Sequence, residues 1–81
     1  MHFPAETSKD ALTRLRRLEG QIRGIQRMIE NEDECRDIVT QLAAAKSALD
    51  RVGFRLMASA LTDPERESDT DELEKLFLKL S

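Results

Sequence analysis

The chain has 81 residues, of which 40% are apolar and 36% are charged, with a formal net charge of -3 and neither Trp nor Tyr. A chain this short forms a single domain, here residues 1–81, and buries little surface by itself, so we expect it to self-associate. The composition disfavours a sandwich or a barrel and predicts an all-α fold of long amphipathic helices. The apolar runs are too short to cross a membrane and the start of the chain lacks a signal-peptide pattern, so we expect a cytoplasmic protein.

The charges are unevenly distributed along the chain. Residues 9–27 contain six basic and two acidic side chains, whereas residues 61–81 contain three basic and seven acidic ones. Basic charge gathered at one end is typical of a protein that offers one face to a polyanion. An ordinary solvated helix surface, with arginines paired to Glu19 or Asp50, would give the same pattern, so charge alone leaves both interpretations open.

The first predicted helix covers residues 8–30 and follows a flexible N-terminus at residues 1–7. Thr7 and Asp10 have the spacing of a capping box. Beyond them, apolar residues recur in steps of three and four as a heptad seam, at Leu15, Leu18, Ile22, Ile25 and Ile29. The acidic run at residues 30–34 interrupts this pattern, so we expect the chain to turn there.

The second predicted helix covers residues 35–61, and a third, shorter one covers residues 69–80. The second seam consists of Ile38, Leu42, Ala45, Leu49, Val52 and Leu56. Pro64 ends it, and Ser68 or Asp69 can cap the third helix. Glycines inside the long helices, at positions 20, 24 and 53, cost about 1 kcal/mol each relative to alanine. We therefore expect a close helix approach at these three positions.

Two long helices joined by a short turn form a hairpin that is too thin to cover its own apolar stripe. Two such hairpins packed together make an antiparallel four-helix bundle. A homodimer is therefore the smallest unit that we expect, and the third helix can extend it to a tetramer built as a dimer of dimers.

Several arginines lie beside or away from the predicted seams. In the first helix, Arg16 projects opposite the seam together with Arg23 and Arg27, whereas Arg14 and Arg17 flank it. In the second helix, Arg51 and Arg55 point away from the seam. The guanidinium fork suits phosphate, but the chain has no helix-turn-helix or zinc-finger pattern that would read bases.

Three stretches of the sequence together resemble one known family. They are "LTRLRRLEGQIRGIQRMIEN", a cysteine at the start of the second helix, and "IVTQLAAAKSALDRVG" followed by "LM". Over residues 8–61 the chain resembles the CsoR/RcnR/FrmR family of small helical repressors, whose branches sense copper, nickel or cobalt, formaldehyde and persulfide. The resemblance implies a tetramer that binds operator DNA and releases it when a small effector acts at the cysteine. It further implies DNA-binding roles for Arg14 and Arg51, supported by Arg16 and Arg17.

The sensing residue implied by this resemblance is Cys35, but its usual metal-binding partners are missing. In the metal-sensing branches, a histidine follows the cysteine by 25 positions and a cysteine or histidine follows by 29. This chain has Ala60 and Pro64 there, and neither side chain can coordinate a metal. His2 is the only histidine, and the nickel/cobalt branch uses an N-terminal one. Cys35 and His2 are therefore the candidate ligands for a copper or nickel ion.

The other branches of the family also fit only in part. The formaldehyde branch uses a proline directly after the initiator, whereas Pro4 is displaced by two positions. The persulfide branch uses a second cysteine, at the position occupied here by Ala60. A single thiol at a helix start remains, where the helix dipole favours the thiolate and the neighbouring acidic residues oppose it.

The main prediction is a DNA-binding repressor that responds to a thiol-reactive effector, such as an electrophile, sulfane sulfur or an oxidant, at Cys35. The alternatives are a copper- or nickel-responsive repressor that uses Cys35 and His2, and a helical interaction module that has lost sensing. Cys35 could also be a buried residue without chemistry. We do not expect an enzyme, because the sequence offers no constellation for acid–base or nucleophilic catalysis.

Overall fold

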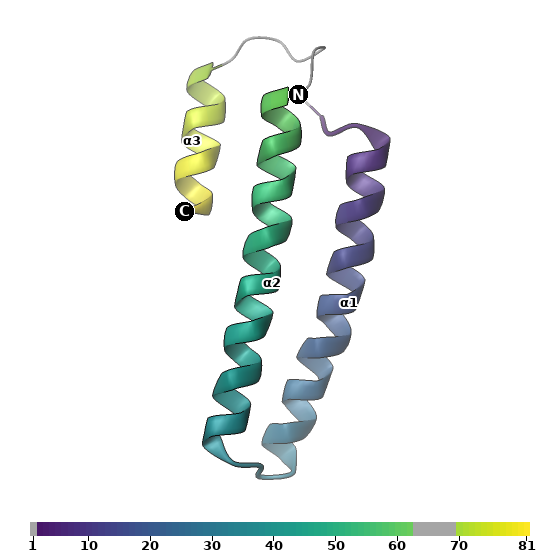
Figure 1. Ribbon diagram of the computed structural model, residues 1–81, viewed down its shortest axis with the longest axis vertical. Coiled ribbons are helices and arrows are strands. Elements are labelled where there is room, and N and C mark those ends of the chain that lie inside the picture. The colour runs from purple at the N-terminus through teal and green to yellow at the C-terminus, as the bar shows by residue number, and fades with distance from the viewer. Residues whose placement is uncertain (1, 63–69) are drawn as a thin grey trace.

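The computed structural model describes residues 2–62 and 70–81, and their regular structure is entirely helical. Helix α1 (Ala5–Glu30) and helix α2 (Cys35–Thr62) form a long antiparallel hairpin, and the short helix α3 (Thr70–Leu80) follows. Figure 1 shows α2 in the middle, with α1 on one side and α3 beside the C-terminal half of α2 on the other. The predicted all-α fold of two long helices and a short one is confirmed.

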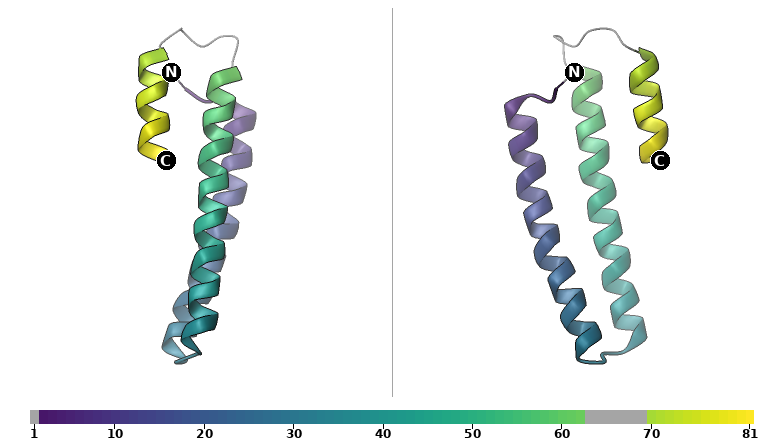
Figure 2. Two further views of the ribbon diagram at one scale, coloured as in Figure 1. Left: turned by 60° about the vertical axis from the view of Figure 1, so that its left-hand side comes forward. Right: turned by 180° about the vertical axis from the view of Figure 1, so that it is seen from behind.

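The protomer is a single layer of helices. It measures 50 × 24 × 13 Å, and its smallest dimension is about the width of one helix. In the right view of Figure 2, α1 and α3 lie on different sides of α2, and no other described helix covers either face of this layer. A core enclosed on all sides therefore cannot form within one protomer. Among the helices of the described residues, none is long and apolar enough to cross a membrane.

Helix α1 begins earlier than the sequence predicted. Pro4, with φ -58° and ψ 153°, precedes the helix, and its carbonyl oxygen accepts a hydrogen bond of 3.0 Å from the backbone N–H of Ser8. Residues 5–7, which the sequence predicted to precede the helix, therefore form the first turn of α1. The predicted capping role of Thr7 is wrong, because its hydroxyl lies 2.8 Å from the hydroxyl of Ser59 on α2. Proline fixes φ near the value that a helix start requires, which explains the earlier beginning.

The turn between α1 and α2 is a Schellman motif, in which orphan carbonyls at the helix end are satisfied by the next residues. The N–H of Glu32 donates to the carbonyl of Ile29, and the N–H of Asp33 donates to that of Met28. Glu32 has φ 56°, the left-handed conformation that glycine adopts most easily. The acidic run therefore forms the turn by backbone hydrogen bonds, and α2 begins directly after it at Cys35.

The predicted seams divide into two stripes. The inner stripe is buried between α1 and α2 and consists of residues seven apart, namely Ala11, Leu18 and Ile25 with Ala45 and Val52. The outer stripe occupies the other heptad position and is 46–56% exposed, and it consists of Ile22, Ile29, Leu42 and Leu49. A hairpin buries one heptad position between its own two helices, and the second needs another partner.

Helix α3 packs against α2 through a separate apolar cluster. Leu73 is 3% exposed and forms this cluster with Met57 and Ala60, while the rings of Phe54 and Phe77 lie 6.3 Å apart. The predicted start of this helix at residue 69, and its predicted caps Ser68 and Asp69, lie outside the described residues.

The glycines differ in what surrounds them. A Cβ atom at Gly53 would lie 2.7 Å from Cδ1 of Leu80, so the predicted close approach occurs here, between α2 and α3. At Gly20 and Gly24 the nearest atoms to such a Cβ belong to Arg23 and Arg27, at 4.0 and 3.9 Å. The expectation of a close helix approach is therefore wrong for these two positions within the protomer.

Candidate functional site

Three of the four predicted DNA-binding arginines line one groove between α1 and α2. Arg14 and Arg17 reach it from α1, and Arg51 reaches it from α2, on a floor that includes the inner-stripe residues Leu18 and Val52. This arginine groove has a volume of about 130 Å³. Because burial of the inner stripe sets how the two helices face each other, it also brings together arginines that are far apart in the sequence.

Arg16 does not belong to the arginine groove. Residues two positions apart in an α-helix are rotated by about 200° about its axis, so position 16 faces away from position 14. Arg16 is exposed and lines neither this groove nor the one beside it. The structure therefore brings together Arg14, Arg17 and Arg51, and it separates the fourth predicted residue from them.

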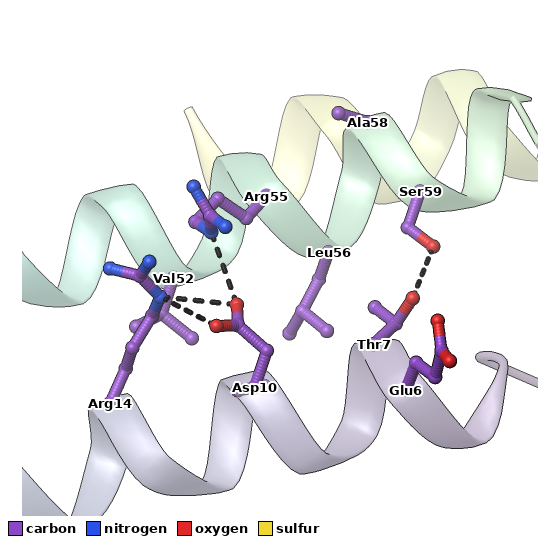
Figure 3. A pocket seen from close by; sticks show the side chains of 10 residues that line it. Glu6, Thr7, Asp10, Arg14, Val52, Arg55, Leu56, Ala58 and Ser59 are labelled. Carbon is purple, nitrogen blue, oxygen red and sulfur yellow. Dashed lines mark hydrogen bonds and ion pairs between the residues drawn. The ribbon is translucent and has the colours of Figure 1, made fainter.

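A second groove adjoins the first at the end of the hairpin away from the turn, and Arg14 lines both. This end groove has a volume of about 390 Å³ and lies between the start of α1 and the end of α2 (Figure 3). Inside it, the Nε atom of Arg14 donates to both oxygens of Asp10, at 3.2 and 3.1 Å. The Nε atom of Arg55, from α2, donates to Oδ2 of the same carboxylate at 3.2 Å. Asp10 therefore holds one arginine from each helix.

The charge of this cluster is positive. The hydrogen bond from Arg14 is the largest cause that lowers the pKa of the Asp10 carboxyl below its ordinary value of 3.8, and Arg55 acts in the same direction, while desolvation opposes both. Asp10 is therefore ionised at neutral pH. One carboxylate between two guanidinium groups leaves a net charge of +1 that is open to solvent.

Sequence reasoning did not assign Asp10 or Arg55 to the site. The only signal was their spacing, since Asp10 stands four residues before Arg14, and Arg55 four after Arg51. The predicted partners of the arginines were Glu19 and Asp50. In the described part of the chain, neither forms an ion pair with an arginine, and Asp10 takes that role twice.

The predicted sensing residue lies at the opposite end of the hairpin. Cys35 is a free, exposed thiol at the first position of α2, directly after the turn. Arg51 is 16 residues further along the same helix, which corresponds to about 24 Å. The interpretation of Cys35 as a buried structural residue does not hold within the protomer. Within one protomer, Cys35 therefore lies far from the arginine groove.

One protomer does not assemble a metal site around Cys35. His2 lies just before α1, at the end of the hairpin away from the turn. Ala60 is 25 residues along α2, about 37 Å away, and is buried against Met57 and Leu73. Within residues 2–62 and 70–81, no three His, Cys, Asp or Glu side chains lie close enough together to hold a metal ion. Pro64, at the second expected ligand position, lies outside the described residues. The donors of a single protomer therefore do not fit a metal ion with several ligands.

Comparison with known proteins places this geometry among repressors. The family model described as a metal-sensitive transcriptional repressor matches residues 7–79. The copper-sensing transcriptional repressor CsoR of Bacillus subtilis (strain 168) is 34% identical over 90 aligned positions, which cover 100% of this chain and 89% of that protein. The copper-sensing transcriptional repressor RicR of Mycobacterium tuberculosis is 51% identical over 49 residues, which cover 60% of this chain and 51% of that protein.

A solved structure is similar along nearly the whole chain. The crystal structure of the copper-sensing repressor CsoR with Cu(I) from Geobacillus thermodenitrificans NG80-2 superposes with a TM-score of 0.73 at 30% sequence identity. The match covers 98% of this chain and 91% of that one. The likeness therefore includes α3 and the acidic C-terminal part, which the resemblance found in the sequence did not cover.

Proposed function

Because this chain belongs to the family of metal-sensitive transcriptional repressors, we propose that it binds operator DNA as a homo-oligomer and releases it when an effector acts at Cys35. The family consists of repressors and not of enzymes. As an operator-binding protein, the chain would work in the cytoplasm. The observation that carries the proposal is the convergence of Arg14, Arg17 and Arg51 from two helices on one exposed groove.

The arginine groove suits the DNA backbone. A guanidinium group donates a fork of hydrogen bonds that matches the oxygens of a phosphate, and such charge-assisted bonds are stronger than neutral ones. Each phosphate that an arginine neutralises releases counterions, so binding through this groove would weaken steeply with salt. We assign the primary contacts to Arg14 and Arg51, with Arg17 in support. Arg16, which faces elsewhere, would contribute only to the general field of the protein.

The outer stripe supports the proposal of an oligomer. A layer one helix thick that exposes about half of each of four large aliphatic side chains resembles half of a bundle. Pairing two outer stripes in an antiparallel homodimer would bury them and complete a four-helix bundle. The exposed apolar side chains of α3 would then join two dimers into a tetramer, and they are Leu76, Phe77, Leu78 and Leu80.

We propose Cu(I) as the first effector to test, because two similar repressors and the similar structure are described as copper-sensing. Cu(I) prefers a soft thiolate and accepts an imidazole, whereas Ni(II) would require more nitrogen and oxygen donors than the chain offers. In an antiparallel dimer the turn of one hairpin meets the open end of the other. That arrangement would bring Cys35 of one subunit near His2 of its partner, the two candidate donors that one protomer keeps apart.

A thiol-reactive effector is the second candidate, and the environment of Ala60 favours it. This position, where the metal-sensing branches have a histidine, is occupied here by a methyl group buried against α3. Cys35 itself is free and exposed. Modification of the thiol would add bulk or charge where two subunits meet, and so shift the oligomer away from its DNA-binding shape.

Fluorescence anisotropy of the reduced protein on a duplex from its own promoter would test the proposal. Cu(I), Ni(II), formaldehyde and a persulfide donor are added separately to the wild type, Cys35→Ser and His2→Ala. We expect Cu(I) to release the DNA, Cys35→Ser to bind DNA without responding, and His2→Ala to need more copper. Release by persulfide but not by copper would establish the second candidate. Failure of the wild type to bind the duplex at any salt concentration would leave a helical interaction module that has lost sensing.

A further inference from the structure

The contact between Asp10 and Arg55 joins residues that are 45 positions apart in the sequence and belong to different helices. Asp10 Oδ2 lies 3.1 Å from Nε of Arg14 and 3.2 Å from Nε of Arg55, so these two Nε atoms are at most 6.3 Å apart. Two positively charged groups repel each other at this distance. The carboxylate between them is therefore what allows the two guanidinium groups to stay together.

We propose that Arg55 is a further DNA-binding residue, and that Asp10 positions Arg55 beside Arg14 so that both arginines bind the same backbone phosphate. This inference rests on the proposed function, because it adds a contact to the same operator-binding surface. It assigns a role to the end groove, which the predicted arginines alone leave without one. Asp10 acts here as a positioning residue, since it would touch the arginines and not the DNA.

The hydrogen bonds to Asp10 leave both arginines free to bind a phosphate. They use only the Nε atoms, as Figure 3 shows, and the terminal nitrogens of Arg14 and Arg55 have no other partner among residues 2–62 and 70–81. The side chains of Arg14 and Arg55 are 39% and 55% exposed. Two orientated pairs of N–H donors match one phosphate group. Asp10, Arg14 and Arg55 together carry a net charge of +1, and the carboxylate of Glu6 lines the same groove.

Arg55 also extends the arginine groove without a break. It follows Arg51 by four residues, so it lies on the same side of α2 and about 6 Å further along its axis. Arg14 lines both grooves and connects them. The surface formed by Arg17, Arg51, Arg14 and Arg55 therefore runs from the middle of the hairpin toward its open end, as a contact with consecutive phosphates would require.

The competing explanation is that the ion pair to Arg55 only fixes α1 against α2. Salt dependence separates the two explanations, because a lost phosphate contact lowers the slope of log K against log salt concentration and a purely structural contact does not. We would therefore measure operator binding by anisotropy at several salt concentrations for the wild type, Arg55→Ala and Arg55→Lys. Arg36→Ala is the matched control, because it removes the same charge from the first turn of the same helix, at the other end.

We expect Arg55→Ala to weaken binding about tenfold and to lower the slope by about 0.9, with the oligomer intact by sedimentation. Arg55→Lys keeps the charge and should keep the slope, while Arg36→Ala should match the wild type. The inference is overturned if Arg55→Ala keeps the wild-type slope, or if the lysine variant lowers it as much as alanine does. If the role of Arg55 is overturned, weakened binding by Arg14→Ala in the same assay would still support the proposed function. A wild type that does not bind the operator would contradict both the role of Arg55 and the proposed function.

Discussion

The inner and outer stripes of the hairpin are both apolar and share the same seven-residue spacing, yet they differ in burial. Leu18 and Ile25 of the inner stripe are 6% and 5% exposed, whereas Ile22 and Leu49 of the outer stripe are 46% and 52% exposed. The difference arises because two helices have only one line of mutual contact. A second line of apolar residues at heptad spacing therefore stays exposed in one protomer and requires helices of another protomer to cover it.

This difference bears on function. The arginine groove depends on the inner stripe, since Leu18 and Val52 form its floor, and it is complete within one protomer. The environment of Cys35 depends on what covers the outer stripe, because the thiol is exposed at the end of the hairpin. The proposed DNA contacts would thus be set by packing within the protomer, whereas sensing would be set by packing between protomers.

The largest effect should follow from placing a charge on the outer stripe. We expect Leu49→Lys to dissociate the oligomer, because burying an unpaired ammonium group between subunits costs several kcal/mol, whereas the isolated hairpin leaves this position in water. Sedimentation and operator binding would both show the loss. Ser47→Lys is the control, since residue 47 is an exposed polar position of the same helix. An oligomer of normal size in Leu49→Lys would mean that the outer stripe is not the interface.

Truncating a side chain of the inner stripe should lower the stability of every protomer. We expect Ile25→Ala to lower the free energy of unfolding by about 3 kcal/mol, as is usual when a large aliphatic side chain is removed from a packed core. Urea denaturation at several protein concentrations would measure it. Ile22→Ala is the matched variant on the outer stripe, and it should raise the protein concentration at which the oligomer dissociates in sedimentation, which Ile25→Ala should change less. An equal shift in the two variants would contradict the division into stripes.

The turn lies outside both stripes, and a suitable substitution there should raise the free energy of unfolding. Glu32 adopts φ 56°, where a side chain is unfavourable and glycine is not. We expect Glu32→Gly to raise the free energy of unfolding by about 0.5–1 kcal/mol, after the greater entropy of glycine in the unfolded chain is subtracted. Glu30→Gly, at the last residue of α1, should instead lower it, by at most about 1 kcal/mol. If both changes destabilise the protein, the left-handed turn is not the native conformation.

The sequence predicted the fold class, the order of the helices and the family, and all three are confirmed. Periodicity and one helix-breaking proline were sufficient for the helices, because these are local signals. The sequence could not separate the inner from the outer stripe, since both follow one heptad pattern and only the packing of the helices distinguishes them. The same limit applies to Thr7, whose spacing suggests a cap although the hydroxyl contacts Ser59 across the hairpin.

The candidate site was predicted in part, for a related reason. Arg14, Arg17 and Arg51 were named, but their convergence depends on how α1 and α2 face each other. Arg55 and Asp10 were not assigned, because their spacing to Arg51 and Arg14 does not reveal that they contact each other across 45 residues. The roles of these residues in DNA binding, and of Cys35 and His2 in sensing, stay predictions.

The smallest expected effect concerns the ion pairs of Asp10, which lie beside the inner stripe. They test whether charge adds to the stability that this stripe gives the hairpin. The hydrogen bond from Arg14 lowers the pKa of Asp10 in the folded protein, so its ionised form stabilises the fold at pH values above the unfolded pKa. This contribution is lost as the pH falls through the lower, folded pKa. We therefore expect Asp10→Asn to reduce the urea midpoint slightly at pH 6, and we expect this reduction to diminish as the pH falls and the carboxylate becomes protonated in the folded state as well. The effect should be small, since the groups are exposed to solvent. In an Arg14→Ala background the same substitution should matter less, as a double-mutant cycle would show. A loss that does not diminish as the pH falls would mean that Asp10 acts through packing and not through its charge.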